Sequence, residues 1–323
     1  MTKNIQNIVA DSRKTLPFVL AYGLLVWFCW GALHPVKPLD SQGSTAFAWL
    51  QLVCFLLSAM LMMFFNSLYA LIRVYSRSVS CTFILLSCAA CFQFGSLEGH
   101  ILTLCILSAF LLLFRTFQDD QSPGWAFYAF LCLGLASLAF IHVVAYIPLF
   151  WVFMIFQLNS AGWRTLIASV FGLLTPYWFV GAVLVAIGNV QPLIVHLKKA
   201  ADWQVLTGYD QLTVNQVLTF ILIVVFGITG IIHFLRNSYA DKIRTRMFYT
   251  CFIFTTLLTM TFIALAPAYC DELLRILIIS TSPLIGHFIA LTHTRVTNVA
   301  FIAGAVLTFL LTLLNLWMPS LNF

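Results

Sequence analysis

The sequence predicts an all-α protein, a polytopic bundle of transmembrane helices, and three observations predict it. Apolar residues make up 62% of the 323-residue chain and charged residues only 8%, against about 25% charged residues in an ordinary soluble domain. Apolar runs near the length of a membrane crossing, roughly 20 helical residues, follow one another along the whole chain. Lysine and arginine gather in alternate links between these runs. The composition excludes disordered, disulfide-scaffold and nucleic-acid-binding proteins, so the net charge of +6 does not indicate a nucleic-acid partner.

We expect eleven membrane spans, with ten as the alternative count. The runs 101–114 and 143–158 are shorter than a full crossing, so one or both could be tilted, extended by flanking polar residues or re-entrant. A break near His142, with Pro148 just beyond it, is expected to separate two helices. The expected spans are residues 16–33, 46–72, 79–94, 101–114, 125–141, 143–158, 165–187, 217–235, 247–266, 273–291 and 299–318.

The distribution of basic residues predicts an N-terminus in the cytoplasm and a C-terminus outside. In this orientation only Lys37, Lys198 and Lys199 fall in outer segments, and cytoplasmic links are the ones that retain lysine and arginine. The bias holds only if residues 125–158 cross the membrane twice. A single crossing would place every later link on the opposite side of the membrane. Residues 1–323 then form a single integral membrane domain, with 1–15 as a cytoplasmic segment. The basic residues assigned to the cytoplasm are Lys3, Arg13, Lys14, Arg73, Arg77, Arg115, Arg164, Arg236, Lys242, Arg244, Arg246 and Arg295.

The first outer loop, residues 34–45, carries a histidine, a lysine and an acid directly after the first span. His34, Lys37 and Asp40 are candidates for a substrate site in this loop, and its two prolines disfavour helix. An ordinary loop leading into the next helix explains the same residues equally well.

The second outer segment, residues 188–213, is long enough to hold a short helix lying on the membrane surface. An apolar stripe and Trp203 favour an interfacial position for this helix. Lys198 and Lys199 could bind the phosphate of a lipid substrate. Lysines near anionic headgroups are also ordinary on any interfacial helix.

The third outer feature is an acidic pair followed by an arginine where the tenth span begins. An arginine inside a span costs about 2.5–3.5 kcal/mol on insertion scales, so Arg275 is expected to have a partner. Asp271 lies four residues earlier, which predicts an ion pair at the helix end. The alternative is that Arg275, beside Asp271 and Glu272, recognises a phosphate or carboxylate.

A few further polar residues flank predicted turns. Glu98 and His100 lie between the third and fourth spans and His142 between the fifth and sixth, and all three are candidate substrate-binding residues. His287 lies within the tenth span, where a lone histidine is more often a packing residue than a ligand. No cofactor is expected and a divalent cation has no support, because the chain lacks H-x-x-x-H, H-E-x-x-H and clustered carboxylates.

The middle of the chain carries a distinctive series of segments. They are LLLFR at 111–115, WAFYAFLCLGLASLAF from Trp125, IPLFWVFMI from Ile147, GWRTLIASVFGLLTPYWF from Gly162, and a closing Gly-Asn at 188–189. This series resembles a family of uncharacterised polytopic inner-membrane proteins of Bacteroidota, sometimes mislabelled as a carotene monooxygenase. The resemblance implies a multi-pass protein of the bacterial inner membrane.

The same pattern is more remotely similar to the membrane module of GT-C glycosyltransferases, which use polyprenyl-phosphate sugars at the outer face of the membrane. That resemblance implies a catalytic role for Asp40 as the first-loop acid, with Arg275 or Lys198 and Lys199 as phosphate partners. The chain departs from the pattern by lacking the paired acid of the first loop.

Three functions remain open. The first is a GT-C-like protein that handles a polyprenyl-phosphate-linked sugar or other lipid-linked substrate at the outer leaflet, and so has the bilayer and such a lipid as partners. The second is a transporter or lipid flippase, for which internal repeats and interrupted helices would be typical. The third is a non-catalytic membrane subunit or assembly factor with a membrane-protein partner.

Overall fold

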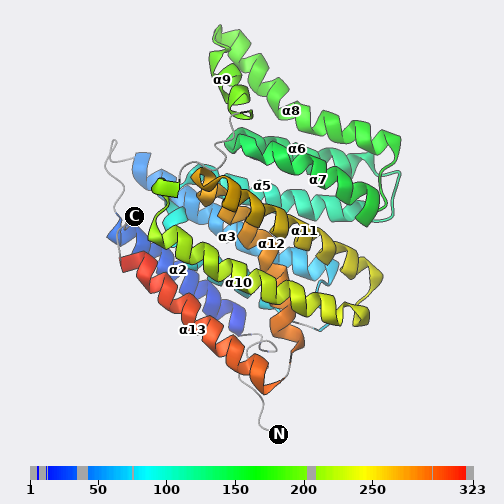
Figure 1. Cartoon of the computed structure of the whole chain (residues 1–323). Helices are drawn as coiled ribbons and strands as arrows, with labels where there is room; N and C mark the ends of the chain where they lie inside the picture. The colour runs from blue at the N-terminus through cyan, green and yellow to red at the C-terminus, as the bar shows by residue number, and fades with distance from the viewer. Residues whose placement is uncertain are drawn as a thin grey trace. The chain divides into compact units, whose positions relative to one another are not determined.

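The computed structural model describes residues 6, 12, 14–34, 43–74, 76–201, 209–292 and 294–317. Within these ranges the chain forms twelve α-helices, labelled α2 to α13, and no strand (Figure 1). The predicted all-α fold class is therefore confirmed. The helices group into two compact units: unit 1 comprises Met1–Leu97 and Leu206–Phe323, and unit 2 comprises Glu98–Val205.

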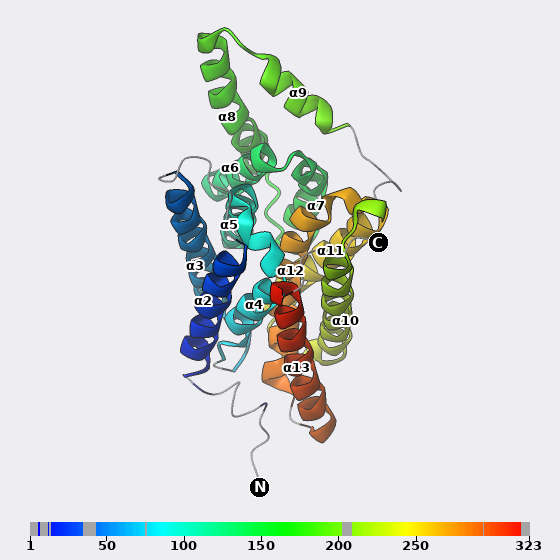
Figure 2. The same ribbon diagram turned by 90° about the vertical axis from the view of Figure 1, so that its left-hand side faces the viewer.

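Unit 1 is built around α12, whose sequence allows it to be buried on all sides. In the most apolar 18-residue window of Pro267–Leu291, 89% of the residues are buried, against 28% for the window of Arg295–Trp317. Helices α4, α10 and α11 pack around α12, as Figure 2 shows. The helices of unit 1 are α2 (Thr15–Leu33), α3 (Gly43–Tyr69), α4 (Ser78–Ala89), α10 (Val214–Asn237), α11 (Ile243–Leu265), α12 (Cys270–Leu291) and α13 (Arg295–Trp317).

Small residues and hydroxyl groups allow α4 to approach α12 closely. A Cβ added to Gly286 would lie 2.9 Å from the Cα and N atoms of Val79. The Ser78 hydroxyl donates to the Gly286 carbonyl at 2.9 Å, and the Thr82 hydroxyl donates to the Ser282 carbonyl at 3.0 Å. Close helix packing through small residues and interhelical hydrogen bonds is typical of membrane bundles.

The charged residues of unit 1 sort by end of the bundle. We call the end where α10 and α12 finish and α11 and α13 begin the basic end. Two hydrogen bonds hold segments together at this end. Asn66 donates to the Ser76 carbonyl, and Gln6 donates to the Ile289 carbonyl. Of the described lysines and arginines in this unit, only Arg275 is on a helix segment at the opposite end. The others, at the basic end, are Lys14, Arg73, Arg77, Arg236, Lys242, Arg244, Arg246 and Arg295.

This sorting is the one that alternating crossings of a membrane produce. Successive helices of unit 1 carry the chain from one end to the other, so that the links at the basic end are those assigned to the cytoplasm. Which end faces the cytoplasm remains a prediction.

Unit 2 is dominated by the packing of α6 against α8. Cβ atoms added to Gly134 and Gly172 would collide with backbone carbonyls of Leu173 and Phe127, respectively, so both positions require glycine for this close approach. Gly188 ends α8 with a positive φ of 78°, as glycine commonly does after a helix. The helices of unit 2 are α5 (Leu97–Leu113), α6 (Pro123–Ala139), α7 (Ile147–Val152), α8 (Trp163–Ile187) and α9 (Gln191–Lys199).

The break expected near His142 is confirmed. Helix α6 ends at Ala139, Phe140 is extended with φ −142° and ψ 102°, and Ile141–Tyr146 forms a 3₁₀-helix, η3. Helix α7 follows and passes into a π-helical turn, Phe153–Gln157. The segment 143–158 is thus helical in three successive geometries.

In the part of the chain that the structure describes, eight helical segments are long and apolar enough to cross a membrane, by length and composition. Three shorter apolar segments, Ser78–Ala89, Pro123–Ala139 and Ile141–Gln157, occupy the remaining expected runs. The run 101–114 is extended by flanking residues to Leu97–Thr116, a full 20 residues. The run 79–94, expected as one span, is interrupted at Ala90 and continues as the 3₁₀-helix Cys91–Gly95, η1. The eight long spans are Thr15–Leu33, Ala46–Tyr69, Leu97–Thr116, Trp163–Ile187, Val214–Ala240, Ile243–Leu265, Pro267–Leu291 and Arg295–Trp317.

Replacing Gly286 by alanine is expected to destabilise the contact between α4 and α12. The added Cβ would meet backbone atoms of Val79, which cannot move without shifting a helix. Overpacking of this kind costs about 1–3 kcal/mol. Thermal unfolding in detergent should therefore occur at a lower temperature for Gly286→Ala than for the matched Gly31→Ala, where an added Cβ meets no atom within 4 Å. Equal unfolding temperatures for the two variants would contradict this packing.

Candidate functional site

The structure places only part of the predicted first-loop site. His34 follows the last residue of α2, where its Nδ1 atom lies 3.3 Å from the Trp30 carbonyl. Its ring stacks on the Trp30 ring with centroids 5.5 Å apart. Lys37 and Asp40 lie outside the described residues, so a catalytic role for Asp40 remains a prediction.

The predicted acidic pair, Asp271 and Glu272, and Arg275 belong to a polar cluster at the end of unit 1 that lies opposite the basic end. Arg275 is buried, with 6% of its surface exposed, and its guanidinium donates to the backbone carbonyl of Gln93. The Gln93 side chain in turn donates to the Asp271 carbonyl at 3.0 Å. The charges of Asp271 and Glu272 both act on Arg275. The arginine therefore has a carbonyl acceptor and compensating negative charge within the protein.

The same cluster holds the beginning of α10. Gln216 donates through Nε2 to Asp271 Oδ1 at 2.7 Å. Gln216 also forms a reciprocal capping box with Thr213, which satisfies backbone groups at the start of the helix. One set of side chains thus ties η1, α10 and α12 together. A structural role for Arg275 follows from these contacts, whereas anion recognition by Arg275 remains a prediction.

The other predicted residues lie in unit 2. Glu98 is exposed in the first turn of α5, and His100, two residues later, is buried. His142 is buried in η3, and η3 contacts α9, which carries the exposed Lys198 and Lys199. The predicted residues therefore divide into one group on each unit.

Helix α9 is attached to α6 through a histidine. His196 Nε2 lies 3.0 Å from the Ser137 carbonyl, and the Ser137 hydroxyl lies 2.7 Å from the Tyr177 hydroxyl of α8. This attachment holds one face of α9, while Lys198 and Lys199 stay exposed. Both ammonium groups are therefore accessible to an anion.

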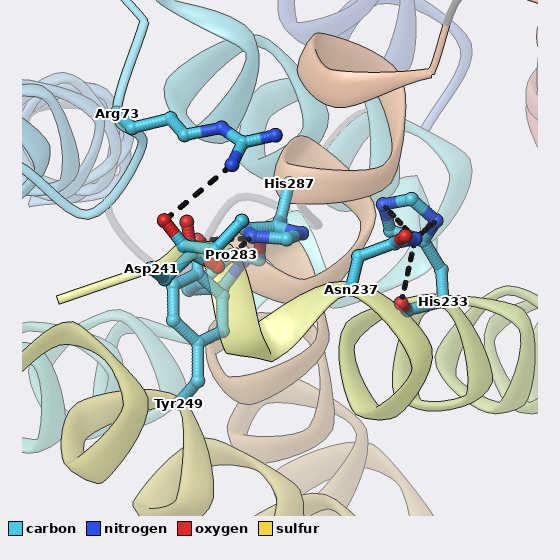
Figure 3. A network of polar contacts seen from close by, with 8 residues as sticks. Arg73, His233, Asn237, Asp241, Tyr249, Pro283 and His287 are labelled. Atoms are coloured by element: carbon cyan, nitrogen blue, oxygen red, sulfur yellow. Dashed lines mark hydrogen bonds and ion pairs between the residues drawn. The ribbon is translucent and has the colours of Figure 1, made fainter. Parts of the chain in front are cut away.

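A second polar network, which the sequence did not predict, lies at the basic end of unit 1 (Figure 3). His287 Nε2 lies 2.9 Å from Asp241 Oδ2, and the two side chains are 0% and 3% exposed, respectively. The contact is an ion pair when His287 is protonated. Arg73 reaches over the same link and lies 3.5 Å from the Ala240 carbonyl.

Aromatic rings and a second histidine surround His287. The rings of Tyr249 and Phe234 lie 5.0 Å and 5.2 Å from the His287 ring, both tilted steeply to it. The His233 ring lies 5.4 Å away, and Asn237 Nδ2 lies 3.0 Å from His233 Nδ1. The His287 Nδ1 atom is buried and has no hydrogen-bond partner among the described residues. Such an arrangement can hold a proton or a polar ligand atom.

The sequence could not pair these groups. His287 and Asp241 are 46 residues apart, and Asp241 lies in a basic link that resembles an ordinary stop-transfer flank. The available signal was an acid within that link, together with a histidine inside a span. Within the described residues no group of three or more His, Cys, Asp or Glu side chains is placed to hold a metal ion.

A cavity of about 280 Å³ lies in unit 1 between α4, α10, α12 and α13. Its lining is almost wholly apolar, and the hydroxyls of the lining threonines Thr82, Thr229 and Thr308 donate to carbonyls of their own helices. Small residues of α13 open the space opposite Phe226 and Phe288. On α13 the cavity is lined by Ala300, Phe301, Ala303, Gly304, Ala305, Leu307 and Thr308.

The fold and these sites define a multi-pass helical membrane protein. No family model, no curated protein and no solved structure matches the chain. The resemblances to the Bacteroidota family and to the GT-C module therefore remain predictions.

The contacts of Arg275 predict that it stabilises the fold. Arg275→Gln removes a hydrogen bond from a charged donor, a loss of about 1.5–3 kcal/mol, so the unfolding temperature in detergent should fall. The double variant Lys198→Gln/Lys199→Gln should unfold at the wild-type temperature, because both lysines are exposed. A wild-type unfolding temperature for Arg275→Gln would argue against a structural role.

Proposed function

We propose that this protein handles a lipid-linked substrate in the bacterial inner membrane and holds the hydrocarbon chain of that lipid in the cavity. The observation that carries the proposal is the cavity itself. Its lining helices α10, α12 and α13 are each long and apolar enough to span a bilayer. An opening among such helices adjoins lipid tails.

The composition of the lining fits a hydrocarbon chain. An apolar void without an occupant forfeits the dispersion contacts of every atom that lines it, and the threonine hydroxyls already donate their protons to helix carbonyls and have none left for a polar ligand. The volume of about 280 Å³ is close to the lower limit of roughly 300 Å³ for ligand pockets. It suits a segment of one chain better than a whole lipid.

The register of α10 and α13 locates the headgroup. A Cβ on Gly304 would lie 3.2 Å from the Phe226 ring, so the antiparallel helices meet at this level. Arg236 lies ten residues beyond Phe226 and Arg295 nine residues before Gly304. At about 1.5 Å per residue, both exposed arginines lie about 14 Å from that contact, toward the basic end.

Arg236 is the better placed of the two for a phosphate. It lies seven residues after Thr229, which lines the cavity, and residues seven apart share a helix face. A guanidinium binds phosphate oxygens in a bidentate manner. A lipid with its chain in the cavity and its phosphate beside Arg236 would occupy the leaflet at the basic end.

The GT-C resemblance supports a separate proposal, in which sugar transfer takes place at the outer face of the membrane and the donor phosphate lies there instead of beside Arg236. In that reaction Asp40 would act as the general base, and Lys198 and Lys199 would bind the donor phosphate. The support from the described residues is the exposure of both lysines on α9. The burial of Arg275 favours the lysines over the arginine as phosphate partners.

A membrane subunit with a protein partner is the second candidate, and one observation favours it. Helix α8 exposes large aromatic side chains, with Trp178 78% and Phe179 67% exposed, and only 11% of its most apolar window is buried. Lipid tails or a partner helix would cover this face.

Filling the cavity should abolish retention of lipid. In Ala303→Trp the indole would enter the cavity, so the fraction of protein carrying lipid should fall several-fold. Native mass spectrometry of the full chain, after exposure to a polyprenyl phosphate and separately to phosphatidylglycerol, measures this fraction. The matched control is Val306→Trp, because Val306 is 51% exposed on α13 and does not line the cavity.

The charge of the headgroup is tested with the same assay. Arg236→Gln should lower retention of both phosphate-bearing lipids while leaving retention of diacylglycerol, which has no phosphate, unchanged. Equal lipid retention by wild type, Ala303→Trp and Val306→Trp would refute the proposed site.

A further inference from the structure

We propose that the Asp241–His287 pair is a proton-binding site, with the Nδ1 atom of His287 as the proton acceptor. We further infer that the occupancy of this site by a proton is coupled to the cavity. The coupling rests on the proposed lipid-binding function, whereas the proton site does not.

The hydrogen-bonding pattern leaves one atom of His287 available. With Asp241 ionised, the carboxylate accepts from Nε2–H at 2.9 Å, which fixes the neutral tautomer that keeps Nδ1 as a bare acceptor. Nδ1 is buried and has no donor among the described residues. A proton arriving at Nδ1 converts the ring to an imidazolium that still donates through Nε2 to Asp241. The proton comes from a hydronium ion of the aqueous phase, whose O–H bond breaks as the N–H bond at Nδ1 forms.

The surroundings can stabilise the imidazolium. Asp241 supplies the counter-charge, since its side chain is 3% exposed and screened little by water. The Tyr249 and Phe234 rings have centroids 5.0 Å and 5.2 Å from the His287 ring, within the distance of about 6 Å at which aromatic rings attract cations.

Other groups oppose the positive charge on His287, and they make its proton equilibrium sensitive to the surroundings. Arg73, from the link after α3, acts on His287 with like charge, and His233 of α10 would do so when protonated. The groups that face His287 are thus Asp241, Arg73, His233 and the Tyr249 hydroxyl, which donates to the Pro283 carbonyl at 3.4 Å (Figure 3). Opposing influences of this kind allow small changes in the surroundings to move the proton equilibrium.

We infer that the proton enters from the basic end. Asp241 belongs to the link between α10 and α11, and its neighbours Tyr239, Ala240 and Lys242 are exposed. His287 lies one turn before the end of α12 at Leu291. The pair therefore lies just beneath the surface of this end.

The pair is also joined directly to the wall of the cavity. Phe288 and Ile289, the residues after His287 on α12, both line the cavity. The His233 ring contacts His287 at 5.4 Å and Phe288 at 5.3 Å between centroids. Repulsion between His287 and His233, when both are protonated, would therefore displace a ring that touches the cavity wall. By linkage, a lipid in the cavity must then alter proton binding to the same extent.

The proton is observed directly by NMR of the full chain carrying ¹⁵N-labelled histidine in detergent. The solution is acidified over about two pH units either side of 6.5, the range in which histidines titrate. We expect one buried ring to start as the Nε2–H tautomer and to gain a proton at Nδ1. This signal should be missing in His287→Gln and unchanged in His196→Gln, the matched control in unit 2.

Asp241→Asn provides a second variant of nearly the same size. It removes the counter-charge, so protonation of His287 should require a more acidic solution than in wild type. A His287 signal that stays in one tautomer throughout, in wild type and Asp241→Asn alike, would overturn the proton site.

The coupling is tested by repeating the lipid-retention measurement with phosphatidylglycerol on both sides of the His287 titration. Retention should differ between the two conditions in wild type and be the same in His287→Gln. A titrating His287 with pH-independent retention would overturn the coupling alone. Absence of retention at any pH, with His287 still titrating, would instead count against the proposed lipid-binding function.

Discussion

The structure depends on the rule that a polar group buried among apolar helices must find its partner inside the protein. Helix α12 shows how the rule is met. Along its middle, hydroxyls of Ser280, Thr281 and Ser282 donate to carbonyls of the same helix. Its ionisable side chains are confined to its two ends, Arg275 near one and His287 near the other, and each has a partner from another segment.

These two ends organise the rest of unit 1. At one end the chain of contacts from Gln93 through Asp271 to Gln216 fixes η1 and the start of α10. At the basic end the Asp241 carboxylate fixes the link between α10 and α11. Because both sets of contacts are made by α12, displacement of α12 along its axis would disturb both ends together.

Much of the fold could be predicted because length and hydropathy are local properties of the sequence. Each expected apolar run falls on a helical segment, and the break near His142 was signalled by its polar side chain and by Pro148. The interruption at Ala90 was not, because residues 79–94 are apolar throughout apart from small hydroxyls and Gln93. There the helix ends where η1 turns to contact α2 and α3, which is a tertiary effect.

The sites were harder to predict because they also depend on tertiary contacts. Proximity in sequence drew attention to Asp271 and Arg275, and the structure adds Gln93 and Gln216 from distant segments as the hydrogen-bonding partners. The pairing of Asp241 with His287, and the cavity opposite the small residues Ala303 and Gly304, arise only when α10, α12 and α13 come together. The periodicity of apolar residues within a single helix predicts neither the Asp241–His287 pair nor the cavity.

The most direct test of this account is the sidedness of the two ends of unit 1. Single cysteines replacing Asp210, exposed at the end opposite the basic end, and Tyr239, exposed at the basic end, can be labelled with a membrane-impermeant maleimide. The native cysteines are buried or half-buried and provide a low background. In spheroplasts of an expressing bacterium, Asp210→Cys should react at once and Tyr239→Cys only after the membrane is permeabilised. Reaction of both cysteines from the same side would contradict the account.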